Sequence, residues 1–134
     1  MKWKAEYSVG IETIDGQHKQ IFSHLLAIEN SLEKKDPWHV MRFLFVQLAE
    51  YMKFHFAVEE AILEIVRYPQ LRDHTASHAR LGEQLAELEE KVKGAGSGAN
   101  LVSFFENWFI GHVLTSDRQY AAYVKEQFPA IFDA

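Results

Sequence analysis

The sequence contains no cysteine, which excludes disulfide bonds, thiolate zinc sites and thiol nucleophiles. Proline is scarce, with only three residues, so few positions interrupt a helix. No apolar run approaches the roughly 18 residues of a membrane span, and the amino-terminal segment MKWKAEYS lacks the apolar stretch of a signal peptide. These absences lead us to expect a cytoplasmic protein that has no contact with a membrane.

Basic residues are fewer than acidic ones: the sequence has 14 Lys and Arg and 19 Asp and Glu, which gives a formal charge of -5. Nucleic acids select basic surfaces, so no nucleic-acid partner is expected. The length of 134 residues suits a single domain over 1–134, and the 48% hydrophobic content is that of a globular protein. The seven histidines are the unusual feature of this composition.

Apolar residues recur at helical spacing over four segments, about 16–35, 37–66, 70–93 and 100–116. Asp15 is a candidate N-cap for the first, and Asp36-Pro37, Tyr68-Pro69 and the flexible stretch Gly94–Gly98 separate the others. No segment alternates with period two over the length of a strand. The sequence therefore predicts an all-α protein, an antiparallel up-down-up-down four-helix bundle. Residues 1–14 predict an extended arm, and residues 117–134 a short helical tail.

Each of the four predicted helices places histidine on the stripe that should face the core, namely at His18, His55, His74, His78 and His112. Side chains four residues apart share a helix face, so Glu59 points in the same direction as His55. His24 and His39 lie off this stripe and are expected at the surface. One core histidine alone is most simply a hydrogen-bonded structural residue.

Five imidazoles and a carboxylate in one core demand a different explanation. Each unpaired buried polar group costs about 1–3 kcal/mol, against a total stability of about 5–15 kcal/mol. A bound metal would compensate for that cost, whereas a purely structural bundle with scattered histidines would not. Five imidazoles are too many for one tetrahedral zinc, and calcium and magnesium prefer oxygen. Imidazole with carboxylate suits iron, manganese or copper.

Asp117 is the predicted second carboxylate, five residues after His112. Five residues on an ideal α-helix rotate by about 140°, so Asp117 reaches the site only if the helix ends or widens between them. Thr115 and Ser116 are suited to ending it by capping. If two six-coordinate metals share two bridging carboxylates and one bridging oxygen, five imidazoles leave a single position open on one metal. Such a site suits one small ligand.

Four segments of the chain resemble the hemerythrin family, specifically its single-domain bacterial members: VGIETIDGQHKQIF, HFAVEE, YPQLRDHTASH and WFIGHVLTSDRQY. The resemblance implies that His74, His78 and His112 bind one iron and that His18 and His55 bind the other. It further implies that Glu59 and Asp117 bridge two iron ions together with an oxo or hydroxo group. Dioxygen would then bind at the vacancy on the two-histidine iron, and Glu60 would be an outward-facing neighbour.

Two residues depart from the family pattern. Phe109 stands where members commonly have a leucine lining the oxygen pocket, and we expect its ring either near the vacancy or against the amino-terminal arm. Arg67 stands where glycine often precedes the Tyr-Pro pair, at the end of the second predicted helix.

The resemblance favours a non-enzymatic protein that binds dioxygen for storage, delivery or sensing. The alternative is a di-iron oxidase, a peroxidase or a nitric-oxide-handling enzyme that uses the same centre. Carboxylate-rich di-iron oxidases carry Glu-x-x-His pairs, and no histidine here has Glu three residues before it. The nitrogen-rich ligand set therefore favours reversible binding over oxidation.

Overall fold

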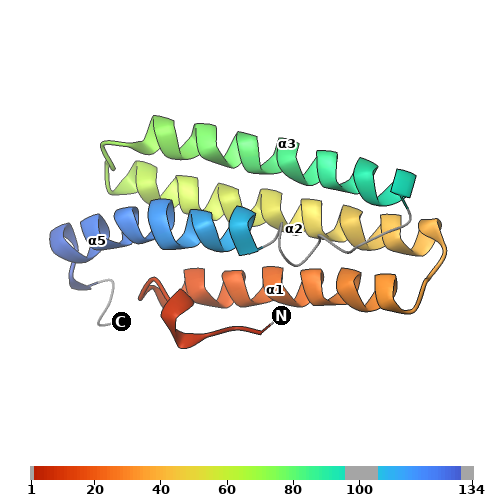
Figure 1. The fold of residues 1–134 in the computed structure, drawn as a ribbon. Helices are drawn as coiled ribbons and strands as arrows, with labels where there is room; N and C mark the ends of the chain where they lie inside the picture. The colour runs from red at the N-terminus through yellow and green to blue at the C-terminus, as the bar shows by residue number, and fades with distance from the viewer. Residues whose placement is uncertain (1, 96–105, 131–134) are drawn as a thin grey trace.

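The computed structural model describes residues 2–95 and 106–130, and within these ranges the regular structure is helical throughout. Helix α1 spans Glu12–Glu33, α2 spans Trp38–Ile65 and α3 spans Leu71–Ala95. A fourth helical segment ends in α5, Arg118–Gln127. Figure 1 shows these helices lying side by side, with successive helices running in opposite directions. The predicted all-α bundle is confirmed.

The fourth helical segment is longer and less regular than the sequence predicted. Helical conformation continues without a break over residues 106–127, so the predicted end at 116 was wrong. Two stretches, η2 (Glu106–Ile110) and η3 (Val113–Asp117), have the wider turns of a π-helix. The predicted start near 100 lies outside the described residues. The tail therefore extends the fourth helix directly and does not form a separate element.

The first helix begins earlier than predicted, and the third ends later. Helix α1 begins at Glu12 with Ile11 as N-cap, so Asp15 lies inside the helix. The Asp15 carboxylate instead accepts a hydrogen bond from the Val9 backbone N–H at 2.8 Å, which holds the arm against the first turn of α1. Helix α3 continues through Gly94 and Ala95, the start of the stretch that was expected to be non-helical. The rest of that stretch lies outside the described residues.

The amino-terminal arm packs on the bundle through aromatic rings. It contains one short 3-10 turn, η1 (Ala5–Tyr7), and is otherwise irregular as far as residue 11, whereas residues 12–14 of the predicted arm belong to α1. The rings of Trp3 and Tyr7 both contact Phe22 of α1, with centroids 5.5 and 5.8 Å away. The Arg118 guanidinium of α5 donates a hydrogen bond to the Glu6 carbonyl. The arm is thus fixed to both the first and the last helix.

The bundle core has apolar layers on either side of a polar one. Toward the α1–α2 connection the core is aliphatic and aromatic, and toward the α2–α3 connection it closes over Leu63, Tyr120 and Val124, all fully buried. Between these layers lie the polar side chains described below. None of the described helices combines the length and the apolar character needed to cross a bilayer.

Candidate metal centre

The structure brings all seven sequence-predicted ligand residues into one cluster. Two groups of side chains have ligand atoms within 4.8 Å of one another: Glu59, His74, His78, His112 and Asp117 form the first, and His18, His55, Glu59 and Asp117 the second. Every member is buried. The two carboxylates belong to both groups, so the cluster consists of a three-histidine set and a two-histidine set that share Glu59 and Asp117.

Glu59 of α2 divides its two oxygens between the histidine sets. Oε1 lies 3.3 Å from His74 Nε2 and 3.0 Å from His78 Nε2, on the three-histidine side. Oε2 lies 3.3 Å from His55 Nε2 and 3.7 Å from His18 Nε2, on the other side. The carboxylate therefore stands between the two sets.

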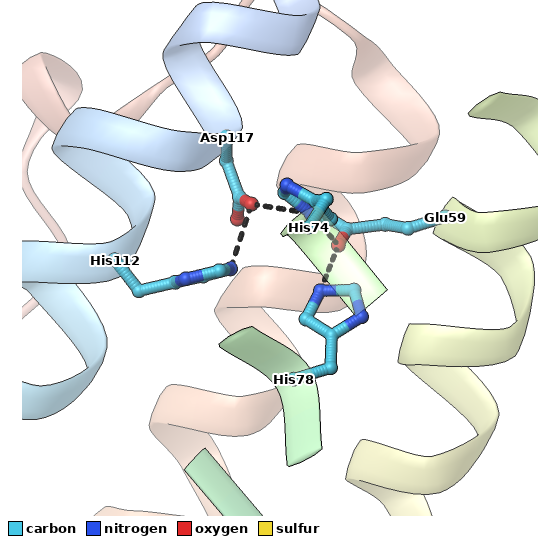
Figure 2. Close-up of side chains that lie close together, drawn as sticks. All are labelled: Glu59, His74, His78, His112 and Asp117. Atoms are coloured by element: carbon cyan, nitrogen blue, oxygen red, sulfur yellow. Dashed lines mark hydrogen bonds and ion pairs between the residues drawn. The ribbon is translucent and has the colours of Figure 1, made fainter. Parts of the chain in front are cut away.

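Asp117 divides its oxygens in the same way. Oδ1 lies 2.9 Å from His112 Nε2 and 3.3 Å from His74 Nε2, and Oδ2 lies 3.1 Å from His18 Nε2. Figure 2 shows Asp117 and Glu59 reaching the three-histidine set from different helices, with the imidazoles of His74, His78 and His112 around them. Two carboxylates with one oxygen toward each set would be able to hold a metal ion on either side.

Asp117 reaches the cluster because the helix widens. Residues 113–117 form a π turn, in which about one extra residue is accommodated per turn, so positions five apart share a face. His112 and Asp117 have this spacing. The Thr115 hydroxyl donates to the Gly111 carbonyl at 2.7 Å and so engages a backbone acceptor within this stretch. The sequence left open whether the helix ends or widens between His112 and Asp117, and in the structure it widens. Thr115 and Ser116 do not end the helix by capping.

Opposite charges in the cluster shift the pKa values of two histidines and of both carboxylates strongly. Burial disfavours a charged imidazole, yet the contacts with Asp117 and Glu59 outweigh it and raise the pKa of His18 and of His74 to about 9 each. Burial likewise opposes a charged Glu59, and its histidine contacts nevertheless hold its pKa well below the ordinary value. The pKa of Asp117 is lowered by its histidine contacts, against burial and the neighbouring charge of Glu59. The carboxylates are anionic and require nearby positive charge, from protons or from metal cations.

Several atoms in the cluster are buried without a well-oriented hydrogen bond to the described residues, although most of them are in the close contacts given above. These are Nδ1 and Nε2 of His18, Nε2 of His78 and His112, and both carboxylate oxygens of Asp117. An unsatisfied buried polar atom is costly, and here nearly all of them face one another across a small space. Imidazole nitrogens and carboxylate oxygens in this combination fit iron, manganese or copper. The residues present are thus chemically suited to a pair of transition-metal ions.

Polar partners behind the imidazoles were not predicted from the sequence. The Nδ1 of His55 lies 2.7 Å from Gln17 Oε1, and the Nδ1 of His78 lies 3.2 Å from Glu60 Oε2. Glu60 is partly exposed, as expected of a non-ligand, but it contacts the far side of an imidazole. Such partners fix the orientation of a metal-binding histidine and raise its basicity.

Tyr120 of α5 is a further residue that the sequence did not reveal. Its fully buried hydroxyl donates a hydrogen bond to Glu59 Oε2 at 2.9 Å. Burial and the adjacent Glu59 charge raise the pKa of Tyr120 well above its ordinary value, so the phenol remains a donor. Its position 61 residues from Glu59 explains why no local pattern indicated the contact.

Phe109 lies at the two-histidine side of the cluster. Its ring packs edge-on against His18, with centroids 5.4 Å apart, and against Phe22 at 5.8 Å. Because Phe22 also contacts the arm, Phe109 is close both to the cluster and to the layer that anchors the arm. His24 and His39 take no part in the cluster: His39 is exposed, and His24 packs on Tyr51 at the bundle surface.

Comparison with known protein families identifies the family of this chain. The model of the hemerythrin HHE cation binding domain matches residues 9–124, which is most of the chain and includes every residue of the cluster. The chain belongs to the hemerythrin family.

Curated relatives agree with this assignment. A bacteriohemerythrin of Clostridium acetobutylicum is 28% identical over 127 residues, covering 88% of this chain and 96% of the relative. A bacteriohemerythrin of Stenotrophomonas maltophilia is 27% identical over 127 residues, covering 92% of this chain and 80% of the relative. One of Methylococcus capsulatus is 25% identical, covering 90% and 93%. The hemerythrin resemblance found in the sequence is confirmed.

Proposed function

We propose that this hemerythrin binds dioxygen reversibly at a non-heme di-iron centre. In this proposal His74, His78 and His112 hold one iron, His18 and His55 hold the other, and Glu59 and Asp117 bridge them. The observation that carries it is the division of each carboxylate, with one oxygen toward each histidine set. A pair of ferrous ions bound in this way would supply the two electrons that dioxygen binding requires.

The asymmetry of the histidine sets supports one ligand site. The three-histidine set supplies one more imidazole than the set of His18 and His55, so the open position belongs to the latter. Phe109 packs on His18 and so lies on the side where a small ligand would enter. Its apolar ring would keep water and protons from that position and would leave too little room for a large substrate.

Binding without turnover is the activity that this site supports best. The donor set is rich in nitrogen, and the relatives carry the name bacteriohemerythrin. Gln17 and Glu60 would hold the imidazoles of His55 and His78 in place, and Tyr120 would hold Glu59. Dioxygen storage, delivery or sensing is the role that follows.

Optical titration tests the proposal. The anaerobic protein, loaded with ferrous iron, is exposed to dioxygen and then purged with inert gas. We expect a visible absorption band that appears with dioxygen, disappears on purging and returns over repeated cycles. His39→Ala is the control, since His39 is exposed and remote from the cluster, and it should cycle as the parent does. Irreversible conversion with consumption of a reductant would instead identify an oxidase.

A further inference from the structure

The outer face of α2 presents large apolar side chains to water. Among the described residues, six large hydrophobic side chains are exposed, and four of these are on α2: Phe43, Val46, Phe54 and Ile65. The exposed fractions of Phe43, Phe54 and Ile65 are 61%, 54% and 79%. Because the opposite face of α2 also fills the bundle core, this helix is apolar on two opposite sides. A helix that is apolar on two opposite sides is normally covered by other protein surface on each of them.

The three most exposed of these side chains form a line. Phe43, Phe54 and Ile65 follow one another at intervals of 11 residues. Eleven residues complete slightly more than three full turns, so the three side chains lie nearly above one another along about 33 Å of helix. Phe54 is at the midpoint of this line. A second α2 packed in the antiparallel direction about Phe54 would place Phe43 against Ile65 of the second copy.

The side chains between these three residues have complementary sizes. On the amino-terminal side of Phe54 the exposed face carries the long residues Gln47 and Glu50, and on the other side it carries Ala57 and Ala61. The same antiparallel arrangement places Gln47 opposite Ala61, and Glu50 opposite the neighbourhood of Ala57. Long side chains thus meet short ones on both sides of the midpoint, which is the self-complementarity that a two-fold interface requires.

Charge and area agree with a second copy as the partner. The exposed charges of α2 are Arg42, Glu50, Lys53 and Glu64, which cancel, although the chain as a whole carries -5. The exposed charges of this helix therefore add no net repulsion between two acidic chains. Together the four exposed apolar side chains have roughly 400 Å² of surface in contact with water, if a fully exposed aromatic residue has about 150–250 Å². That is about half of the roughly 800 Å² per partner that a stable interface buries, before the rest of the face is included.

We propose that the outer face of α2 is the interface of an antiparallel dimer of this chain, with Phe54 at the two-fold axis. The proposal does not depend on the metal centre, because Phe54 faces outward while its neighbour His55 is buried in the cluster. The partner is a second copy of this chain, because the spacing and the sizes of the side chains on this face match those of the same face in the antiparallel direction.

Sedimentation equilibrium of the iron-loaded protein over a wide concentration range tests the state of assembly. The parent chain should be dimeric, and Phe54→Lys, which places two like charges at the axis, should raise the dissociation constant at least about 100-fold. Leu26→Lys is the matched control. Leu26 is an exposed leucine two positions after His24, whose ring packs on Tyr51 of α2, and so lies on the side of α1 that faces away from α2. Iron content and circular dichroism confirm that both variants are folded.

Cysteine cross-linking tests the register, since the chain has no cysteine of its own. With a short thiol cross-linker, Phe54→Cys should join to itself, and Phe43→Cys should join to Ile65→Cys when the two variants are mixed. Phe43→Cys alone should not cross-link, because its two copies lie far apart along the antiparallel helices. A parent chain that remains monomeric at all concentrations overturns the proposal, and so does efficient cross-linking of Phe43→Cys to itself, which indicates a parallel pair.

Discussion

At the scale of single residues, two carboxylates decide what the cluster can hold. Glu59 and Asp117 are completely buried and come from different helices, yet each directs one oxygen to His18 and the other to His74. Burying two anions together is expensive unless positive charge lies between or beside them. In the proposed centre, each carboxylate contacts both metal ions, whereas each imidazole contacts one.

The first prediction follows from this difference. Glu59→Ala or Asp117→Ala should reduce the iron bound per folded chain more than His18→Ala or His55→Ala, because loss of a bridge weakens both metal positions. Iron analysis after gel filtration measures the effect, with circular dichroism as the check on folding and His39→Ala as the control. If Asp117→Ala retains both irons and the parent spectrum, Asp117 is a structural residue only.

Phe109 supports a second prediction at this scale. Phe109→Ala should open a cavity beside His18, speed the binding of azide and accelerate autoxidation of the dioxygen complex. The ring is 2% exposed, so its removal should also lower the free energy of unfolding by about 3–5 kcal/mol. Stopped-flow absorbance and denaturant titration measure these effects. Unchanged azide and autoxidation rates in a folded variant would show that Phe109 serves only the packing under the arm.

Most residues of the cluster could be located from the sequence because they follow helical spacing, whereas Asp117 and the hydrogen-bonding partners of the cluster do not. His55 and Glu59 are one turn apart, and so are His74 and His78, so periodicity alone assigns each pair to one face. The contacts of Gln17, Glu60 and Tyr120 join residues 38, 18 and 61 positions apart. Such pairings depend on how the helices are rotated against one another, which no local pattern in a single sequence reveals.

At the scale of elements, the π turn over Val113–Asp117 is the feature that completes the cluster. The five-residue separation of His112 and Asp117 signalled an irregular helix, but the sequence left open whether the helix would end or widen. Thr115 and Ser116 are compatible with both outcomes, since their hydroxyls can cap a helix or bond to backbone carbonyls within it. The backbone hydrogen bonds of the surrounding helix decide between these possibilities, and they become visible only in the structure.

The ends of α1 and α2 share another feature that the sequence indicated only in part. Lys35 and Arg67 have φ angles of 56° and 55°, in the left-handed region that favours glycine. At each helix end, the backbone N–H of this residue and that of the residue after it donate hydrogen bonds to carbonyls of the last helical turn, as in a Schellman motif. The Arg67 departure from the family pattern therefore falls at a position where glycine fits best.

The third prediction is that Lys35→Gly and Arg67→Gly each stabilise the protein, because glycine adopts this conformation without the steric cost of a Cβ atom. We expect a gain of about 1 kcal/mol for each, diminished by the greater freedom of glycine in the unfolded chain. Thermal unfolding of the iron-loaded protein measures it. Exposed Lys53→Gly, inside α2, is the control and should destabilise instead. A loss of stability at both helix ends would contradict the account of these turns.

At the scale of the whole molecule, the polar layer makes stability depend on pH and on metal. In the metal-free protein, His18 and His74 have pKa values of about 9, above the ordinary 6.5. Their stabilising contribution is complete below about pH 6.5 and is lost as the pH rises through 9. Glu59 and Asp117 have lowered pKa values, so their contribution is present above their ordinary values of 4.5 and 3.8 and is lost as the pH falls.

The fourth prediction is therefore a stability maximum of the metal-free protein between about pH 4.5 and 6.5, with a decline toward pH 9. Thermal unfolding in the presence of a chelator measures it across the pH range. His18→Gln should flatten the alkaline decline, since glutamine has no proton to lose. Bound iron replaces those protons, so the iron-loaded protein should melt higher than the metal-free protein at pH 7 and above. Equal melting temperatures with and without iron would be inconsistent with a metal in the polar layer.

The central claim is that one chain holds two metals between shared carboxylates, and anaerobic titration of the metal-free protein with ferrous iron tests it most directly. Iron retained per folded chain is counted after removal of the excess, and Asp117→Ala is titrated in parallel. The account predicts that binding saturates at two irons per chain, with a deficit in the variant. Saturation at one iron per chain, equal in the parent and in Asp117→Ala, would contradict it.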